Sequence, residues 1–205
     1  MKNKGLSNII YNDAKTSYPI HELIAKRWSA RAFSDRPVER SKLLSILEAA
    51  RWAPSSHNEQ PWRYIVFTQD NPKKLKEAQS VLFEGNSFAK KAPILICAIA
   101  KKEYSHNESY NRLHFHDLGA ANENMFLEAV NQGLTMHEMG GFDIDKARSI
   151  FQIPKEYEIG IMIAIGYQGS IHSISDKFKE KAQLPRERKH ISEFAFLEEL
   201  NNGIV

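Results

Sequence analysis

The sequence predicts one α+β domain, and three observations support this fold class. Three stretches have the apolar or β-rich composition of strands: RYIVFTQD at 63–70, ILICAIA at 94–100 and EIGIMIAIGYQG at 158–169. Between them, apolar residues recur at helical spacing rather than in strict alternation. The length of 205 residues suits a single domain, with or without terminal arms.

Helices are expected around these strands. Leu43, Leu47 and Ala50 follow helical spacing, and Pro54 ends their helix. Asn71 followed by Pro72 is typical of a helix start, because Asn caps the first turn and Pro suits the first helical position. The expected helices are IHELIAKRW at 20–28, SKLLSILEAARWA at 41–53, NPKKLKEAQSVLF at 71–83, residues 110–132 and DIDKARSIF at 143–151.

Residues 1–18 are expected to form an N-terminal arm and residues 19–205 the domain, which ends in a basic tail. The net charge of +3 is too mild for a typical nucleic-acid binder. The single cysteine, Cys97, lies in an apolar run and reads as a buried hydrophobe. Without a disulfide framework, a signal-peptide pattern or a membrane-helix pattern, the expected location is the cytoplasm.

The stretch AKRWSARAFSDRPV at 25–38 keeps two guanidinium groups in a segment that has the composition of a packed one. Arg27 and Arg31 lie four residues apart, with two aromatic residues close by. A solvated basic face would carry more lysine and fewer aromatic residues. The two arginines therefore either pair with carboxylates or bind an anion that the chain does not carry. Residue types alone leave both possibilities open.

The polar stretch APSSHNEQPW at 53–62 follows a helix directly and precedes a strand. It presents hydroxyl, imidazole and amide groups between Pro54 and Pro61. Loops held on rigid flanks commonly carry binding groups. Serine and asparagine also form plain polar turns, and composition alone slightly favours that interpretation.

The tail segment LPRERKH carries Arg186, Arg188 and Lys189. Most charge runs are solvated patches. These cations would suit a phosphate if the fold brought one of them to Arg27 and Arg31, because the planar fork of arginine matches phosphate oxygens in pairs.

Several familiar site patterns are missing, among them GxGxxG, GxxxxGK[ST] and GxSxG. His114, His116 and Asp117 in LHFHDLG resemble metal ligands. Residues two apart on a helix do not face each other, so only His114 and Asp117 converge, and two ligands make a poor site. No metal is expected, and a helix hydrogen bond or a subunit contact is the expected role.

Several motifs together resemble the nitroreductase-like FMN-dependent oxidoreductases over roughly residues 20–195. This resemblance implies an α+β fold with a central mixed β-sheet surrounded by helices. It also implies an intertwined homodimer with FMN bound at the dimer interface. The motifs occur in the order of the family: KRWSARAF at 26–33, APSSHNEQPW at 53–62, MHEMGGFD at 136–143, AIGYQG at 164–169 and the basic tail.

The resemblance assigns cofactor contacts but no catalytic side chain. Arg27, Ser29, Arg31 and Arg188 match phosphate and ribityl contacts, while Trp28 stands where the family pattern usually has Arg or His. The loop at 54–58 matches one that packs on the flavin from the partner subunit, and the segment at 139–141 matches one whose backbone N–H groups approach the ring edge. The full expected set is Arg27, Trp28, Ser29, Arg31, Pro54, Ser55, Ser56, Asn58, Asn86, Met139, Gly140, Gly141 and Arg188.

The implied reaction transfers a hydride from NAD(P)H through FMN to a nitro compound, a quinone or a related small acceptor, by a ping-pong mechanism. The cofactor performs the hydride chemistry, so no acid–base pair is needed. A proton could come from His137, His57 or water. Two alternatives stay open: a flavin-binding protein for storage or sensing, and a specialised relative that reduces aldehydes or enals, dehalogenates, or breaks down flavin.

Overall fold

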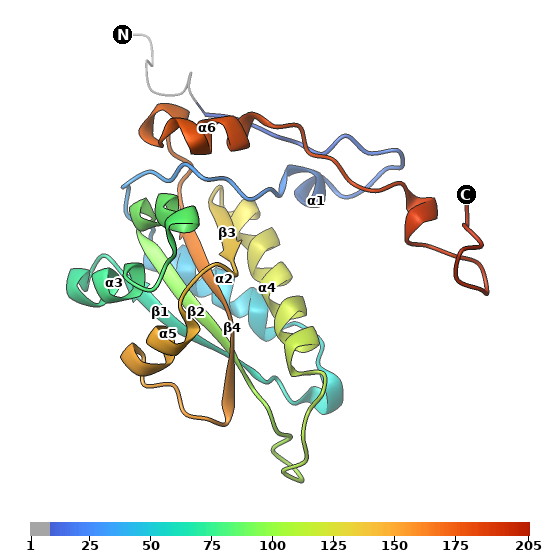
Figure 1. The fold of residues 1–205 in the computed structure, drawn as a ribbon, viewed down its shortest axis with the longest axis horizontal. Coiled ribbons are helices and arrows are strands. Elements are labelled where there is room, and N and C mark those ends of the chain that lie inside the picture. Colours follow the sequence, from blue (N-terminus) through green and yellow to red (C-terminus); the bar gives the residue numbers. More distant parts are fainter. Residues whose placement is uncertain (1–8) are drawn as a thin grey trace.

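The computed structural model describes residues 9–205 and confirms the α+β class (Figure 1). The sheet has the strand order β1-β2-β4-β3. Its strands are β1 (Trp62–Thr68), β2 (Ile94–Lys101), β3 (Thr135–Met139) and β4 (Tyr157–Gly166). The α-helices are α1 (Glu22–Lys26), α2 (Arg40–Arg51), α3 (Pro72–Gln79), α4 (His114–Asn131), α5 (Ile144–Ile150) and α6 (Asp176–Gln183).

The strand directions differ from the mixed sheet that the sequence predicts. All three strand pairings, β1 with β2, β2 with β4 and β3 with β4, are antiparallel. The expectation of a mixed sheet is therefore wrong for the described part of one chain. The intertwined dimer stays a prediction.

Helices cover both faces of the sheet, and this explains why the central strand β2 is apolar along its whole length. Ile96 and Ala98 face the core built with α2 and α4, whereas Leu95 and Cys97 face the core to which α3, α5 and α6 contribute. Successive side chains of a strand point to opposite faces, so a central strand buried on both sides has a continuous apolar run. Burial also raises the pKa of the Cys97 thiol to about 12, as expected for a structural cysteine.

Two elements are absent from the sequence prediction. β3 carries His137 and Glu138 in a five-residue edge strand, and these polar residues hide its strand character. α6 lies in the segment that was expected only to be a basic tail, and it buries only Phe178 and Ala182, which are four residues apart. Both elements owe their structure to tertiary packing rather than to a strong local pattern.

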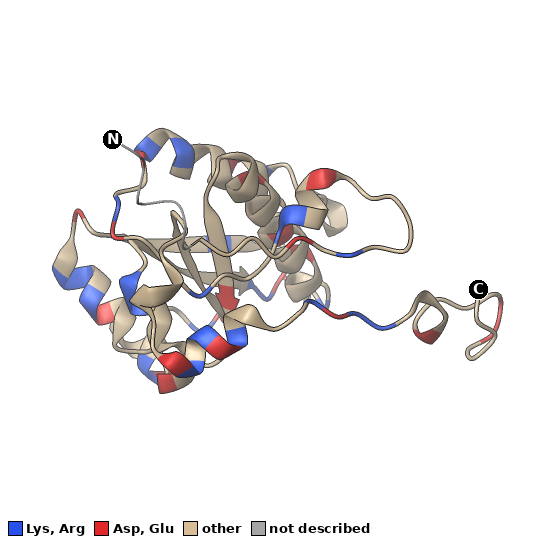
Figure 2. Cartoon of the chain, turned by 90° about the horizontal axis from the view of Figure 1, so that it is seen from above, with Lys and Arg blue, Asp and Glu red and all other residues tan. Residues whose placement is uncertain are grey.

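The N-terminal arm and the C-terminal tail differ in how they contact the domain. In the arm, residues 1–8 lie outside the described part, whereas Gln168 Nε2 donates to Ile10 O at 2.6 Å and Ala14 N donates to Ala25 O at 2.9 Å. The tail beyond α6 extends away from the body in both views (Figures 1 and 2). It exposes Phe194, Leu197 and Leu200.

Candidate functional site

The stretch that carries Arg27 and Arg31, called the arginine segment from here on, crosses the end of β4 in an extended conformation. Phe33 forms a bridge with Gln168, Gly169 N donates to Ala32 O at 2.8 Å, and Ser34 N donates to Tyr167 O at 2.8 Å. A side chain at Gly169 would come within 2.5 Å of Phe33 O, so this close approach requires glycine. The buried Ala30 and Ala32 flank Arg31 in this segment.

Four arginines surround one cavity of about 320 Å³: Arg27, Arg31, Arg186 and Arg188. Among the described residues, the Arg31 guanidinium has neither a hydrogen bond nor a carboxylate partner, and its Cζ lies 5.9 Å from the centroid of the Phe88 ring. Burial lowers its pKa because the charged form loses hydration. A half-buried cation without an anion is expected where a bound anion normally completes the site.

The four arginines play unequal parts. Arg186 Nη1 donates to Asn12 O at 2.9 Å and to Ala25 O at 2.8 Å, so it ties the arm to the tail. Arg188 is exposed, and its one hydrogen bond within the described chain goes to the carbonyl of Glu187 at 2.7 Å. Arg188 is therefore freer to reach an anion than Arg186.

The remaining predicted residues of the arginine segment also face this cavity. Trp28 and Ser29 line it together with Arg27 and Arg31. Trp28 also lines a neighbouring cavity of about 440 Å³ next to Tyr167. The structure thus places Trp28 at the wall between two cavities, where its indole offers one N–H donor.

A second group of predicted residues lies beside the arginine segment. Asn86 Nδ2 donates to Gly141 O at 2.8 Å, which joins the turn after α3 to the end of β3. His137 Nδ1 donates to Ala30 O at 2.9 Å, and the ring packs on Phe88 with centroids 4.7 Å apart. These contacts connect the arginine segment, Asn86 and the glycine pair through β3, and nothing lies within 4 Å of the position that a Cβ would take at Gly140.

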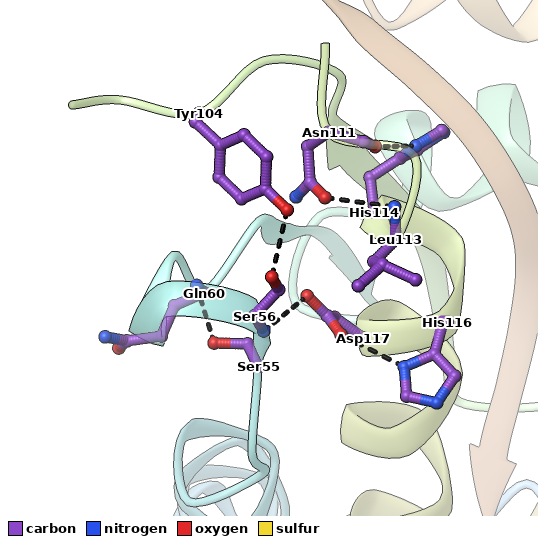
Figure 3. A network of polar contacts seen from close by, with 9 residues as sticks. All are labelled: Ser55, Ser56, Gln60, Tyr104, Asn111, Leu113, His114, His116 and Asp117. Atoms are coloured by element: carbon purple, nitrogen blue, oxygen red, sulfur yellow. Dashed lines mark hydrogen bonds and ion pairs between the residues drawn. The ribbon is translucent and has the colours of Figure 1, made fainter. Parts of the chain in front are cut away.

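The loop at 54–60 is held by hydrogen bonds from a different set of elements (Figure 3). Ser56 N donates to the buried Asp117 carboxylate of α4 at 3.0 Å, and Ser56 Oγ lies 2.9 Å from the Tyr104 hydroxyl. Ser55 Oγ accepts a hydrogen bond from Gln60 N at 3.0 Å. Pro54 and Asn58 are exposed. The loop is thus rigid at its base, with its tip free to contact another molecule.

Backbone strain is concentrated in this loop. His57, Asn58 and Gln60 all have positive φ angles, between 51° and 54°. Such angles cost free energy for residues other than glycine and persist where surrounding contacts impose them. A plain polar turn, which the composition slightly favours, does not explain three positive φ angles within four residues.

The loop and the arginines lie at opposite ends of the sheet. Trp62, just after the loop, pairs with Ala100 at one end of β2, whereas the Phe33–Gln168 bridge lies beyond the Ile94–Ile165 pair at the other end. The seven residues of β1 span about 20 Å at roughly 3.3 Å per residue. Among residues 9–205, no hydrogen bond or ion pair joins the loop to the arginine segment, although Ser56 and Arg27 contact the same helix, at Asp117 and at Glu123 of α4.

Two carboxylates near Arg27 were missing from the sequence prediction. Glu123 on α4 lies 3.9 Å from Arg27 Nε, and Arg27 also stacks over Phe126 at 4.7 Å. Burial, with Glu123 as a neighbouring negative charge, raises the pKa of Glu138 to about 7, against a smaller opposing effect of Arg27. Glu138 lies within the MHEMGGFD motif but was given no role, and no motif includes Glu123; the structure relates both residues to Arg27 only once β3 has joined the sheet.

His137, in contrast, is a poor proton donor. Burial lowers its pKa to about 4, so the ring is neutral near pH 7. Its Nδ1 hydrogen is used by a backbone carbonyl, and it points to the sheet face opposite to Glu138. Of the two histidines considered from the sequence, only His57 is exposed.

The LHFHDLG stretch provides structural hydrogen bonds. His114 contacts Asn111 O at 2.7 Å and Glu158 Oε2 at 2.9 Å, and Asp117 binds the loop at Ser56 N. Within residues 9–205 no group of three or more His, Cys, Asp or Glu side chains is arranged to hold a metal. Over the same residues, no helix is both long and apolar enough to cross a membrane.

Comparison with known proteins gives matches over most of the chain. NADH dehydrogenase of Thermus thermophilus is 29% identical over 196 residues, covering 76% of this chain and 86% of that protein. A crystal structure described as an oxidoreductase containing FMN has a TM-score of 0.86 and 31% identity, covering 92% of this chain and 96% of the other.

A second solved structure, an FMN-dependent nitroreductase of Clostridium difficile, has a TM-score of 0.60 and 27% identity, covering 80% of this chain and 96% of its own. The sequence profile of the Nitroreductase family matches residues 24–167, which is more than half of the chain and includes the arginine segment, the 54–60 loop and the glycine pair. The prediction from the sequence motifs is confirmed, and the chain belongs to the Nitroreductase family.

Proposed function

We propose that the protein is an FMN-dependent oxidoreductase that passes a hydride from NAD(P)H to a nitro compound, a quinone or a related small acceptor. The main observation in support of FMN as the cofactor is the half-buried Arg31 guanidinium. It has no anionic partner among the described residues and faces a cavity shared with Arg27 and Arg188. The family assignment and the FMN in related structures support the same cofactor.

The residues present fit FMN. Its phosphate suits the arginine cavity, and Ser29 adds a hydroxyl donor at the same wall. The backbone near Gly140 offers a flat approach, since nothing lies within 4 Å of the position of a missing side chain. When bound, FMN supplies the hydride chemistry, and the N–H groups of this segment orient the ring and stabilise negative charge on it.

We further propose that each site is shared by two chains of a homodimer. The 54–58 loop precedes the Trp62–Ala100 pair and the arginine segment joins β4 at the Phe33–Gln168 bridge, at opposite ends of the sheet of one chain. The tip of the loop is exposed although its base is firmly hydrogen-bonded. The tail carries exposed apolar side chains, including Phe194 and Leu200, which a second copy would cover. Both features are those of a surface completed by a partner.

Turnover is expected to be ping-pong. The chain has no separate nucleotide-binding motif, so the nicotinamide and the acceptor have to use the same space over the flavin in turn. Initial rates at several fixed acceptor concentrations should give parallel double-reciprocal lines. Intersecting lines together with product-inhibition patterns of a ternary complex would refute a shared pocket.

The direct test of the function is anaerobic reduction of the FMN-reconstituted protein. NADH or NADPH should bleach the flavin absorbance, and a nitro compound or a quinone should restore it. A protein that binds FMN but is not reduced by either nucleotide would be a flavin-binding protein without turnover. The cytoplasmic location and the division at residue 18 remain predictions that this test does not address.

A further inference from the structure

The loop at 102–110, which follows β2, is closed by backbone hydrogen bonds. At its base, Asn111 N donates to Lys102 O at 2.7 Å, and nearer its tip Tyr104 N donates to Ser109 O at 2.9 Å. These bonds fix the backbone of Tyr104 within the loop. The Tyr104 side chain is left free to contact a neighbouring element.

This loop holds the loop at 54–60 through two side-chain contacts. The Tyr104 hydroxyl lies 2.9 Å from Ser56 Oγ. The Glu59 carboxylate accepts hydrogen bonds from Ser105 N at 2.9 Å and from Ser105 Oγ at 2.6 Å. Each contact uses a side chain of the 54–60 loop, so it depends on the residue type and not on backbone pairing alone.

The strained backbone lies between these two contacts. His57 and Asn58 have φ angles of 52° and 54°, and they are flanked by Ser56 and Glu59. Ser56 is held a second time by the Asp117 carboxylate of α4, which accepts a hydrogen bond from Ser56 N at 3.0 Å (Figure 3). Positive φ angles outside glycine persist where surrounding contacts impose them. The contacts on either side therefore keep this dipeptide in a conformation that the chain does not favour by itself.

Three rings form a cluster at the tip: His57, Tyr104 and His106. The ring centroid of His57 lies 5.4 Å from that of Tyr104 and 5.4 Å from that of His106, and the last two are 5.3 Å apart. His57 and His106 are exposed. Tyr104 thus has two separable parts, because its ring supports the His57 ring whereas its hydroxyl contacts Ser56.

We propose that Tyr104 is a positioning residue for the flavin. Its hydroxyl holds the 54–60 loop in the conformation in which this loop contacts the ring of an FMN bound to the arginines of a second chain. This inference rests on the proposed function, because it requires FMN in a site shared by two chains. Tyr104 acts through Ser56 and has no part in binding the phosphate. Loss of the hydroxyl should therefore weaken the binding of the ring, whether or not the ligand carries a phosphate.

Flavin affinity tests the role of the hydroxyl, with quenching of flavin fluorescence as the measurement. Tyr104→Phe keeps the ring and removes one neutral hydrogen bond, so FMN and riboflavin should both bind about three- to tenfold more weakly. Tyr110→Phe is the matched control on the same loop, because Tyr110 is exposed and its hydroxyl has no hydrogen bond within residues 9–205. It should leave both affinities unchanged. If Tyr104→Phe does not fold, Ser105→Ala, which removes a hydrogen bond to Glu59, takes its place with the same expectation.

Mixed dimers assign the effect to the site of the second chain. A Tyr104→Phe chain and an Arg31→Glu chain carry different affinity tags, and the mixed dimers are isolated through both tags. One site then combines the arginines of the first chain with the unaltered loop of the second, and the other site combines both changes. FMN should titrate one site per dimer with the affinity of the unaltered protein. A folding defect within the Tyr104→Phe chain would not be corrected in this way.

The outcomes separate this inference from the proposed function. If the unaltered protein binds no flavin, the proposed function fails. If FMN binds, and Tyr104→Phe binds FMN and riboflavin as tightly as the unaltered protein, Tyr104 does not position the loop. A loss with FMN alone would place the effect at the phosphate, and a weakened site in the mixed dimers would place it in the chain that carries the change. Either of these results would overturn the inference.

Discussion

Replacing Arg31 by methionine should affect FMN affinity and apo-protein stability in opposite directions. The guanidinium is half-buried with no anionic partner among the described residues, so the apo protein bears the cost of its lost hydration. Methionine has a similar length and keeps an apolar contact with Phe88. We expect Arg31→Met to leave the apo protein as stable as before, or to stabilise it by up to about 1 kcal/mol.

The expected loss of FMN affinity follows from the phosphate contact. Removing one charge-assisted hydrogen bond costs about 1.5–3 kcal/mol, which corresponds to roughly ten- to hundredfold in affinity. Stabilisation by a saturating ligand falls by the same free energy. For a chain of this size each kcal/mol is about 2–4 °C, so the FMN-induced increase in melting temperature should shrink by about 3–12 °C.

Thermal unfolding with and without FMN measures both effects in one experiment. Arg40→Met, at an exposed position of α2, is the matched control and should leave the response to FMN unchanged. Riboflavin provides the second control, since its affinity for Arg31→Met should change little. Equal losses for FMN and riboflavin, or a clear loss of apo stability, would show that Arg31 supports the fold rather than a phosphate.

Two further predictions concern β3 and its end. Burial lowers the pKa of His137 from 6.5 to about 4. Between these pH values the unfolded chain binds a proton at this residue that the folded chain does not bind. The free energy of unfolding should therefore fall by up to about 3 kcal/mol as the pH falls from 6.5 to 4. Urea unfolding at several pH values checks this, and a His137→Gln variant with an equally steep pH dependence would contradict it. Gly141→Ala should lower the melting temperature, because its Cβ would lie 2.8 Å from Asn86 Nδ2, whereas Gly140→Val should leave apo stability unchanged and weaken FMN binding. Wild-type FMN affinity in Gly140→Val would exclude the ring from that position.

Much of the fold could be predicted because its central elements have strong local patterns. The continuous apolar runs at 94–100 and 158–169 form β2 and β4, since a strand buried on both faces needs no alternation. The helix expected at 110–132 is α4, although its first turn begins only at His114 because Tyr110 and Asn111 pair with the preceding loop. Motif order was sufficient to identify the family.

The rest could not be predicted because it depends on contacts between distant segments. β3 becomes a strand only by pairing with β4, so its polar residues obscured both the element and the position of Glu138. The anchoring of Arg186 by Asn12 O depends on the arm lying against the tail. The mixed sheet was implied by the family resemblance, and the composition of the strands offered no check on it, because composition does not distinguish antiparallel from parallel neighbours when both faces are covered.

The measurement that tests the central claim most directly is complementation between two defective chains. Arg31→Glu removes the anion site, and Pro54→Trp adds bulk at the exposed loop without removing a hydrogen-bond donor. Each variant alone should be folded and dimeric but lack FMN. After random subunit exchange, half of the dimers are mixed, and in each of these one site carries both changes and the other neither. FMN content should then recover to about a quarter of wild type, whereas proven exchange with no recovery would place both motifs in the site of one chain and contradict the shared site.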